Sequence, residues 1–398
     1  MKRQKTLSGL CHLSKSLYNE GNYQIRQEFF KHNKWIRYNV LYHLMKSSKN
    51  YKELPAQTAQ QVLKILDRNW KSFFNSIKAW KDNKSKFKGR PKLPKYKPKN
   101  GEFLLVFTNQ QVRLIDNVLR FPGKVGMEIK TRLQDKTDIR EVRILPKGVG
   151  YVVEIVYMKN FYPKPLNKGN IIAIDLGVRN LITTVNNNGL KPFIIKGGIV
   201  KSINQYYNKK RARIQSIYGF QGIKTGKKLQ RLTQKRNEKI KDYFHKISRC
   251  VINYCLLNDI GTVVIGYNFN WKQNCQIGKK NNQNFITIPY WKLIHQLEYK
   301  AEEQGIIVVK TEESYSSKCS FLDKESIKFH NKFLGKRISR GLYKSHGGII
   351  INADVNGAYN ILKKAFLNAV DADRIEDVGL HPTRWRLASV TNLFMTSC

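Results

Sequence analysis

Ile171-Ile172-Ala173-Ile174-Asp175-Leu176-Gly177 is the stretch of sequence that decides the fold of the second half of the chain. The apolar run that ends on a carboxylate predicts a buried strand with Asp175 at its exit. Gly177 then permits a turn. A lone acid in this position more often caps a turn than performs chemistry, so its meaning depends on the residues that the fold brings to it.

The residues that follow predict a mixed unit of strands and helices around this strand. Strands are predicted at 181–185, 192–195, 262–266 and 306–310, and helices at 201–257, with a break near 219–226, and at 291–304. A further apolar run leads to Asn352-Ala353-Asp354 and then into a helix that reaches about residue 367. Asp354 is therefore a second acid at the end of a strand or the start of a helix. Only a fold could bring it to Asp175.

The first part of the chain predicts a helical region followed by a strand-rich region. Apolar positions recur at helical spacing between residues 7 and 82. The segment 84–100 is rich in lysine, and its prolines break any helix. Alternating apolar residues and turns over 102–158 predict a small antiparallel barrel or sheet, and 163–169 is typical of a linker.

The charge of the chain restricts its partners. Its 398 residues include 73 Lys plus Arg against 28 Asp plus Glu, which gives a formal net charge of +45. A compact body with this excess repels itself, and binding to a polyanion relieves the repulsion through counterion release. No apolar run approaches the roughly 20 residues of a membrane span, and no signal-peptide core follows Met1. We therefore expect an intracellular protein that binds nucleic acid.

The six cysteines are scattered and form no C-x-x-C pair. Neither a zinc ribbon nor a thioredoxin-type site is therefore predicted. Cys250 and Cys255 lie in an apolar stretch, which favours buried core positions. No disulfide is expected in a reducing cytosol.

The two acid-bearing stretches resemble motifs of a known family. Ile172-Ala173-Ile174-Asp175-Leu176-Gly177 and Asn352-Ala353-Asp354-Val355-Asn356-Gly357-Ala358 resemble the first and third RuvC motifs of the TnpB family of transposon-encoded RNA-guided DNA endonucleases. The resemblance covers most of the chain and implies an α+β multidomain protein. Its implied parts are a helical region at 1–83, a basic junction and β-rich domain at 84–168, an RNase-H-like (RuvC) α/β domain at 169–367 with a basic helical insertion at about 201–258 and an insert at about 319–348, and a C-terminal tail at 368–398.

The resemblance also implies an activity, a cofactor and partners. The chain would cleave target DNA by two-metal phosphodiester hydrolysis, with Asp175 and Asp354 as ligands of Mg²⁺ or Mn²⁺. Its partners would be a guide RNA from the element end and double-stranded target DNA, in the cytoplasm of a prokaryote at the nucleoid. Basic residues expected to face nucleic acid are Lys209, Lys210, Arg211, Arg213, Lys336, Arg337 and Arg340. Tyr267, Phe269 and Trp271 could stack on bases or pack in the core.

One departure from the family pattern concerns the second RuvC motif. The family places a Glu at the end of a strand where this sequence reads Val263-Val264-Ile265-Gly266. Some relatives place a Glu just before a Ser/Thr-Ser-Lys stretch that follows the next strand, and Glu313 matches that position better than Glu312. Because neighbouring strands lie about 5 Å apart, a Glu there could reach the same metals. Either Glu313 completes the site, or the site is dead and the chain is a guide-directed DNA-binding repressor. A non-guided RNA-binding structural protein is a further alternative.

A second departure concerns zinc. The family commonly has two C-x-x-C pairs between its second and third motifs, whereas only Cys319 remains here, with Leu322 in the place of its partner. We therefore predict no zinc, and we expect the insert to pack on its own apolar residues. Relatives also often open with a strand before the first helix, whereas Met1 here is followed almost directly by Leu7-Ser8-Gly9-Leu10, so some N-terminal residues are expected to be missing.

Overall fold

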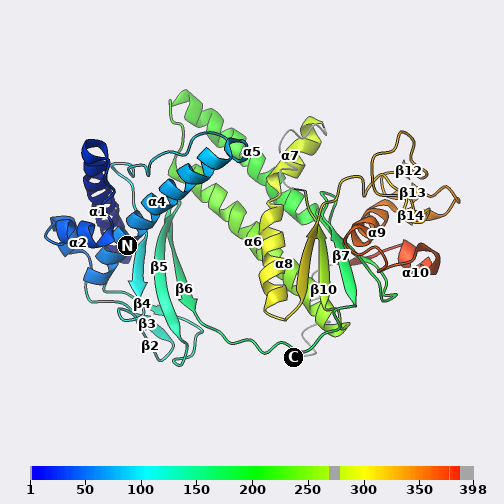
Figure 1. Cartoon of the computed structure of the whole chain (residues 1–398), viewed down its shortest axis with the longest axis horizontal. Coiled ribbons are helices and arrows are strands. Elements are labelled where there is room, and N and C mark those ends of the chain that lie inside the picture. The colour runs from blue at the N-terminus through cyan, green and yellow to red at the C-terminus, as the bar shows by residue number, and fades with distance from the viewer. Residues whose placement is uncertain (1, 269–277, 376, 386–398) are drawn as a thin grey trace. The chain divides into compact units, whose positions relative to one another are not determined.

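The computed structural model describes residues 2–268, 278–375 and 377–385 (Figure 1). The chain divides into two compact units, Met1–Asn160 and Phe161–Cys398. Each unit has hydrophobic clusters of its own. Within the part of the chain that the structure describes, no helix is both long enough and apolar enough to cross a bilayer.

Helices form the first part of the N-terminal unit, over the region where the sequence predicts them. They are α1 (Lys2–His32), α2 (Tyr38–Met45), α3 (Lys49–Glu53), α4 (Ala56–Asp82) and the short 3-10 helix η1 (Lys84–Lys86). Val62, Leu63, Leu66 and Trp70 of α4 are buried, because their spacing places them on one face of the helix. This face packs against α1 and the first strand of the unit.

The strands of the N-terminal unit form open antiparallel sheets. The first sheet contains β1 (Leu105–Thr108), β5 (Ile139–Lys147) and β6 (Gly150–Tyr157), in the order β1-β5-β6. The second contains β2 (Arg113–Ile115), β3 (Val118–Arg120) and β4 (Glu128–Lys130). Of the two forms that the sequence allows for 102–158, the described residues therefore adopt sheets and do not close into a barrel.

A single mixed sheet is the framework of the second unit. Its strands are β7 (Ile171–Asp175), β8 (Asn180–Asn186), β9 (Phe193–Lys196), β10 (Thr262–Gly266), β11 (Ile307–Thr311) and β15 (Thr383–Trp385). Their spatial order is β11-β10-β7-β8-β9-β15. β8 is antiparallel to both β7 and β9, whereas β10 is parallel to both β7 and β11. The strand that ends at Asp175 therefore lies in the interior of the sheet.

Helices cover both faces of this sheet. Ile172 and Ile174 of β7 pack in the same cluster as residues of α6 (Lys227–Leu257) and α8 (Tyr290–Glu302), whereas Ala173 packs in the cluster that contains α9 (Ala353–Ala365). Figure 1 shows α6 and α8 on one side of β7 and β10, and α9 on the other. Because side chains alternate along a strand, Asp175 belongs to the face that α9 covers.

The other elements of the second unit surround this core. They are α5 (Gly198–Phe220), α7 (Lys279–Thr287), the antiparallel strands β12 (Lys336–Ser339), β13 (Leu342–Lys344) and β14 (Ile350–Asn352), the 3-10 helix η2 (Ala372–Arg374) and α10 (Asp377–Leu380). α5 and α6 contact each other and flank the break that the sequence predicts near 219–226.

The segment 368–398, expected to be a tail, contributes a strand to the sheet. β15 pairs with β9 in parallel orientation. The ring of Trp385 stacks on Phe193, with ring centroids 3.8 Å apart. The sequence signal for this strand is weak because β15 is short and only Trp385 of its residues is apolar. The stacking of Trp385 on Phe193 therefore contributes to the position of β15 beside β9.

Candidate metal-binding carboxylate site

Asp175 lies at the end of β7, against the first turns of α9. A β-carbon at position 357 of α9 would lie 3.5 Å from Asp175 Oδ2, which is an ordinary van der Waals distance, so the start of α9 lies directly against the carboxylate. Burial raises the pKa of Asp175 well above its usual range, the nearby charges of Glu313 and Asp354 raise it further, and Arg337 opposes them. Asp175 therefore has acidic neighbours from two distant parts of the chain.

Asp354 is positioned by the start of α9. Asn352 is the N-cap of this helix, and its side chain accepts hydrogen bonds from the backbone N–H groups of Asp354 and Val355 at 3.0 and 3.2 Å. An acid in the first turn also interacts favourably with the helix dipole. The Asp354 carboxylate accepts a hydrogen bond from Asn180 Nδ2 at 2.7 Å and pairs with the Arg337 guanidinium at 3.3 Å. These contacts fix its position on the side of the sheet that carries Asp175.

Gly266 is the last residue of β10. A side chain at this position would point to the face of the sheet that α9 covers, which is also the face of Asp175. Gly266 pairs in register with Thr311 of β11, two residues before Glu313. A β-carbon at position 266 would lie 2.5 Å from Ile361 Cδ1 and 3.0 Å from Glu313 Oε2. The Glu313 carboxylate and a side chain of α9 therefore occupy the space that a residue larger than glycine would need at the end of β10.

Glu313 is half-buried, and part of its hydrogen-bonding capacity is unused. Its backbone N–H donates to Asn268 Oδ1 at 3.0 Å, which holds the chain just after β11. Among the described residues its Oε2 atom is buried without a hydrogen-bond partner. Burial raises the pKa of Glu313 to about 7, and the charge of Glu312 adds to the rise while Lys364 opposes it. A buried carboxylate oxygen in this state has a strong requirement for a proton or a cation.

Glu312 differs from Glu313 in its surroundings. Its side chain is 53% exposed and forms an ion pair with Lys364. Its other carboxylate oxygen accepts a hydrogen bond from the backbone N–H of Ser314 at 2.9 Å. Glu312 is thus a solvated acid with partners of its own.

The carboxylates of Asp175, Glu313 and Asp354 supply a donor set that suits a hard divalent cation. Mg²⁺ and Mn²⁺ prefer oxygen ligands, and Mg²⁺ retains several waters, so few carboxylates are needed. The unpartnered Oε2 atom of Glu313 also fits a cation. As the side chains stand, no group of three or more His, Cys, Asp or Glu residues among those described is arranged to hold a metal ion. Arg337 and Asn180 instead hold the Asp354 carboxylate.

The other predicted nucleic-acid residues are all exposed, but one of them, Arg337, also contacts a site acid. Lys209, Lys210, Arg211 and Arg213 are exposed on α5, and Lys336 and Arg340 are exposed at β12 and the turn after it. The site acid that Arg337 contacts is Asp354. Tyr267 packs against the hydrophobic core of the sheet, whereas Phe269 and Trp271 lie outside the described residues.

The insert at about 319–348 is held together by buried polar groups. Cys319 is fully buried, and its thiol donates to two backbone carbonyl oxygens at 3.5 and 3.6 Å. Glu325 is also buried and accepts hydrogen bonds from the backbone N–H groups of Ser320 and Leu334 at 2.7 and 2.9 Å. These contacts tie the start of the insert to its middle.

Sequence reasoning missed the contacts of three polar residues at the site, one of which, Arg337, was expected to face nucleic acid. Asn180 begins β8 and Arg337 lies on β12, yet both contact Asp354. Asn268 follows β10 and contacts the backbone of Glu313. Each comes from a segment far from its partner in sequence, so spacing alone carries no signal for it. The only sequence signal is that Asn180 and Asn268 lie next to predicted strands, at 181–185 and 262–266.

Comparison with known proteins agrees with this architecture. Residues 149–272 match the family described as probable transposase (OrfB_IS605), and residues 290–361 match the Cas12f1-like TNB domain. The TnpB-like protein ORF457 of Acidianus two-tailed virus is 28% identical over 408 aligned residues, which cover 91% of this chain and 84% of that protein. The putative RNA-guided DNA endonuclease InsQ of Escherichia coli (strain K12) is 24% identical, with 83% of this chain and 81% of that protein covered.

A solved structure shares the fold. The protein in a cryo-EM structure of a Cas12f1–sgRNA–target DNA complex superposes with a TM-score of 0.56 at 14% identity, over 91% of this chain and 82% of that one. The two matched regions, 149–272 and 290–361, are thus similar to an OrfB-type probable transposase and to a Cas12f1-like protein, respectively. The TnpB-like relatives extend this resemblance over most of the chain and support the TnpB family.

Proposed function

We propose that this chain is an RNA-guided DNA endonuclease of transposon origin. The names of the relatives support this activity, since InsQ is described as a putative RNA-guided DNA endonuclease. The net charge of +45 supports a role in which the protein holds long stretches of nucleic acid backbone. The partners would be a guide RNA from the element end and double-stranded target DNA.

We assign the second unit to the RNase-H-like (RuvC) class. Three adjacent antiparallel strands, β9-β8-β7, followed by the parallel strands β10 and β11, support this assignment. So does the placement of acids at the end of β7 and in the first turn of α9. Acids held on regular elements keep the fixed positions that phosphodiester chemistry requires.

Asp175, Glu313 and Asp354 would hold the metal ions. Bound Mg²⁺ or Mn²⁺ would supply activation of a water molecule and stabilisation of the leaving oxygen. Asp175 and Asp354 provide carboxylates from β7 and α9, and Asn180 and Arg337 orient the Asp354 carboxylate. Glu313 provides the third carboxylate, in place of the acid that is missing at Gly266.

The observation that carries this proposal is that the Glu313 carboxylate lies where a side chain at position 266 would begin. A glutamate at position 266 would have to start from a β-carbon only 3.0 Å from Glu313 Oε2. A side chain at position 266 and the Glu313 carboxylate would therefore occupy the same volume. Glycine at position 266 leaves that volume to Glu313. This arrangement supports the proposal that Glu313 takes the role of the second-motif acid. If that acid had simply been lost, nothing would require another carboxylate to lie beside Gly266.

Cleavage by the full-length protein tests the proposal. The protein, with RNA from its own element end, is incubated with matched double-stranded DNA and Mg²⁺. We expect cutting of matched DNA, no cutting of mismatched DNA, and loss of cutting in Asp175→Ala. Absence of cutting by the unsubstituted protein, or cutting that survives Asp175→Ala, would refute it.

A nuclease-dead, guide-directed repressor is the second candidate. The contact between Arg337 and Asp354 favours it, because a cationic side chain already neutralises one of the acids. This candidate requires RNA-dependent binding of matched DNA without cleavage, and binding that Glu313→Gln leaves unchanged. The same incubation, followed by electrophoresis under native and denaturing conditions, separates the two candidates.

A further inference from the structure

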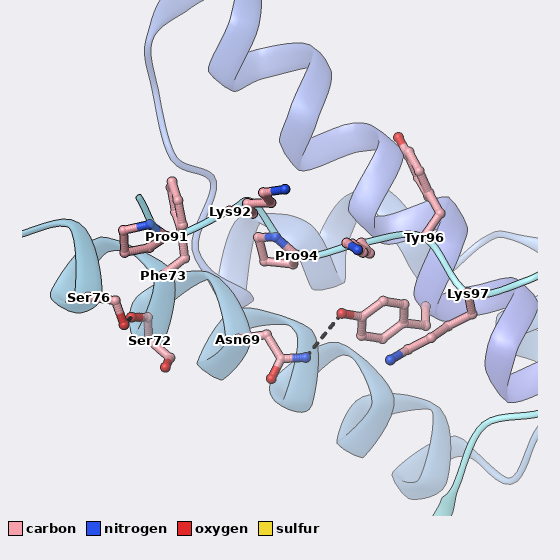
Figure 2. A pocket seen from close by; sticks show the side chains of 11 residues that line it. Asn69, Ser72, Phe73, Ser76, Pro91, Lys92, Pro94, Tyr96 and Lys97 are labelled. Atoms are coloured by element: carbon pink, nitrogen blue, oxygen red, sulfur yellow. Dashed lines mark hydrogen bonds between the residues drawn. The ribbon is translucent and has the colours of Figure 1, made fainter. Parts of the chain in front are cut away.

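A pocket lies within the N-terminal unit, between α4 and an extended segment rich in proline and lysine. Its volume is about 360 Å³, which is within the range of roughly 300–1,000 Å³ typical of small-molecule sites. Figure 2 shows Asn69, Ser72, Phe73 and Ser76 of α4 along one side of it, and the extended segment from Pro91 to Lys97 along the other. The carboxylate site belongs to the second unit, so this pocket is a separate feature.

The extended segment 91–99, here called the proline strap, is held rigidly by α1. Side chains spaced along one face of α1 bond to the strap backbone: Lys15, Asn19, Asn22 and Arg26. Asn22 and Arg26 both donate to the Pro94 carbonyl, at 3.1 and 2.6 Å. Trp70 Nε1 in turn donates to Asn22 Oδ1 at 2.9 Å, which fixes the orientation of that amide. One wall of the pocket is therefore pre-organised, which reduces the entropy lost on binding.

The α4 wall presents small polar groups. Asn69, Ser72, Phe73 and Ser76 recur at helical spacing, so they share one face. Asn69 Nδ2 donates to the Tyr18 hydroxyl at 3.0 Å, which directs the amide and leaves its carbonyl oxygen as an acceptor. Ser76 Oγ donates to the Ser72 carbonyl at 2.8 Å, so its hydroxyl oxygen can accept another bond. Hydroxyl and amide groups in this arrangement suit a ribose hydroxyl and the edge of a base.

The strap wall carries positive charge and an aromatic ring. The described residues that line the pocket include Lys92, Lys95 and Lys97 and no acid. Lys92 and Lys95 are exposed at its rim, where they can bind phosphodiester oxygens. Tyr96 is 43% exposed, and the Arg26 guanidinium lies 4.7 Å from its ring centroid. The lysines of the strap wall are thus the groups that hold the backbone of a single strand.

We propose that this pocket binds one unstacked nucleotide of single-stranded RNA. Phe73 supplies a surface for the base, Asn69 and the serines bind the base edge and the 2′-hydroxyl, and Lys92 and Lys95 bind the flanking phosphates. The exposed Tyr96 ring points away from α4 (Figure 2) and lies outside the space for the base. A base in a duplex is stacked between its neighbours and cannot enter a pocket of this volume. We therefore expect the pocket to bind single-stranded RNA and not a duplex. The lysine-rich segment 84–100 would thus contact RNA through this pocket.

Ser72→Trp tests the pocket because it fills the cavity without changing the net charge. Asn75→Trp is the matched control, since Asn75 is exposed on the same helix but does not line the pocket. The affinity of each full-length variant for a fluorescein-labelled single-stranded oligoribonucleotide is measured by anisotropy, without Mg²⁺ or target DNA. We expect Ser72→Trp to weaken binding about tenfold, the effect of losing one stacked base, and Asn75→Trp to change it less than about twofold.

Several outcomes would overturn the proposal. Equal affinities of the unsubstituted protein and Ser72→Trp would show that the cavity binds no nucleotide. Equal weakening by both tryptophan variants would assign the effect to the α4 surface instead. A single-stranded DNA of the same sequence that binds as tightly as the RNA would refute the role of the 2′-hydroxyl. Because the assay requires no cleavage, its failure is distinct from failure of the endonuclease proposal.

Discussion

Replacing Gly266 with alanine tests how tightly the face of the sheet around the acids is packed. The added methyl group would lie 2.5 Å from Ile361 Cδ1 and 3.0 Å from Glu313 Oε2. Ile361 is fully buried, so it cannot move away without disturbing its own neighbours. Insertion of a methylene into a well-packed core costs about 1–3 kcal/mol. We expect Gly266→Ala to lower the local free energy of unfolding by an amount in this range.

A second substitution identifies the atom responsible. Ile361→Val removes Cδ1, the atom closest to the new methyl group, and by itself costs about 0.5–1.5 kcal/mol. In the double variant the closest contact of the alanine is gone, although Glu313 Oε2 at 3.0 Å and Ile361 Cγ1 at 3.2 Å remain, so the combined loss should be about 1 kcal/mol smaller than the sum of the single losses. Ile247→Val is the matched control: Ile247 is equally buried but packs in the cluster on the opposite face of the sheet.

Hydrogen exchange of the amides of β7 and β10 is the suitable assay, because it reports the stability of this sheet separately from that of the N-terminal unit. Gly266→Ala and Ile247→Val should be additive within about 0.5 kcal/mol, as expected for distant sites. If Gly266→Ala and Ile361→Val are equally additive, Ile361 does not fill the space above Gly266 and the packing argument fails.

Three further expectations concern buried polar groups. Burial lowers the pKa of Lys300 to about 8 in the folded chain. Between pH 8 and the ordinary pKa of lysine, the unfolded chain therefore binds more protons than the folded chain. The contribution of Lys300 to the free energy of unfolding rises with pH over this range. The free energy of unfolding of Lys300→Met relative to the native chain should therefore fall by about 1–2 kcal/mol between pH 7.5 and 9.5, and a pH-independent difference would contradict this. Asn22→Ala leaves the Trp70 N–H unpaired and should cost about 1–3 kcal/mol in thermal unfolding, whereas an unchanged midpoint would mean that the strap is held by other contacts. Glu325→Gln turns an amide donor toward a backbone donor, so proteolysis of 319–348 should accelerate, and an unchanged cleavage rate would show that this carboxylate does not hold the insert together.

The sequence predicts most of the regular elements of the second unit because their patterns are local. Ile171–Asp175 and Thr262–Gly266 are apolar runs that end at a turn, and both form strands. β15 was not predicted, because its place depends on contact between Trp385 and Phe193, which are far apart in sequence. The antiparallel strands over 102–158 could be predicted, but their division into two open sheets depends on pairings that alternation does not specify.

The candidate site could be predicted only in part. Asp175 and Asp354 follow from strand and helix ends, and the structure places both on the face that α9 covers. The choice between Glu312 and Glu313 rests on which side chain turns inward, and the exposure of Glu312 separates the two. The contact of Arg337 with Asp354 could not be foreseen, because charge alone assigns an arginine on the insert to nucleic acid.

The cleavage rates of Glu313→Gln and Glu312→Gln test the central claim, that Glu313 replaces the acid missing at Gly266. Both substitutions replace a carboxylate by an amide at adjacent residues, but only the Glu313 carboxylate lies beside Gly266. With matched DNA, element-end RNA and saturating Mg²⁺, we expect Glu313→Gln to slow cleavage at least about hundredfold, as the loss of a metal ligand requires, and Glu312→Gln to remain within about twofold of the unsubstituted protein. Cleavage by Glu313→Gln at the unsubstituted rate would contradict the claim.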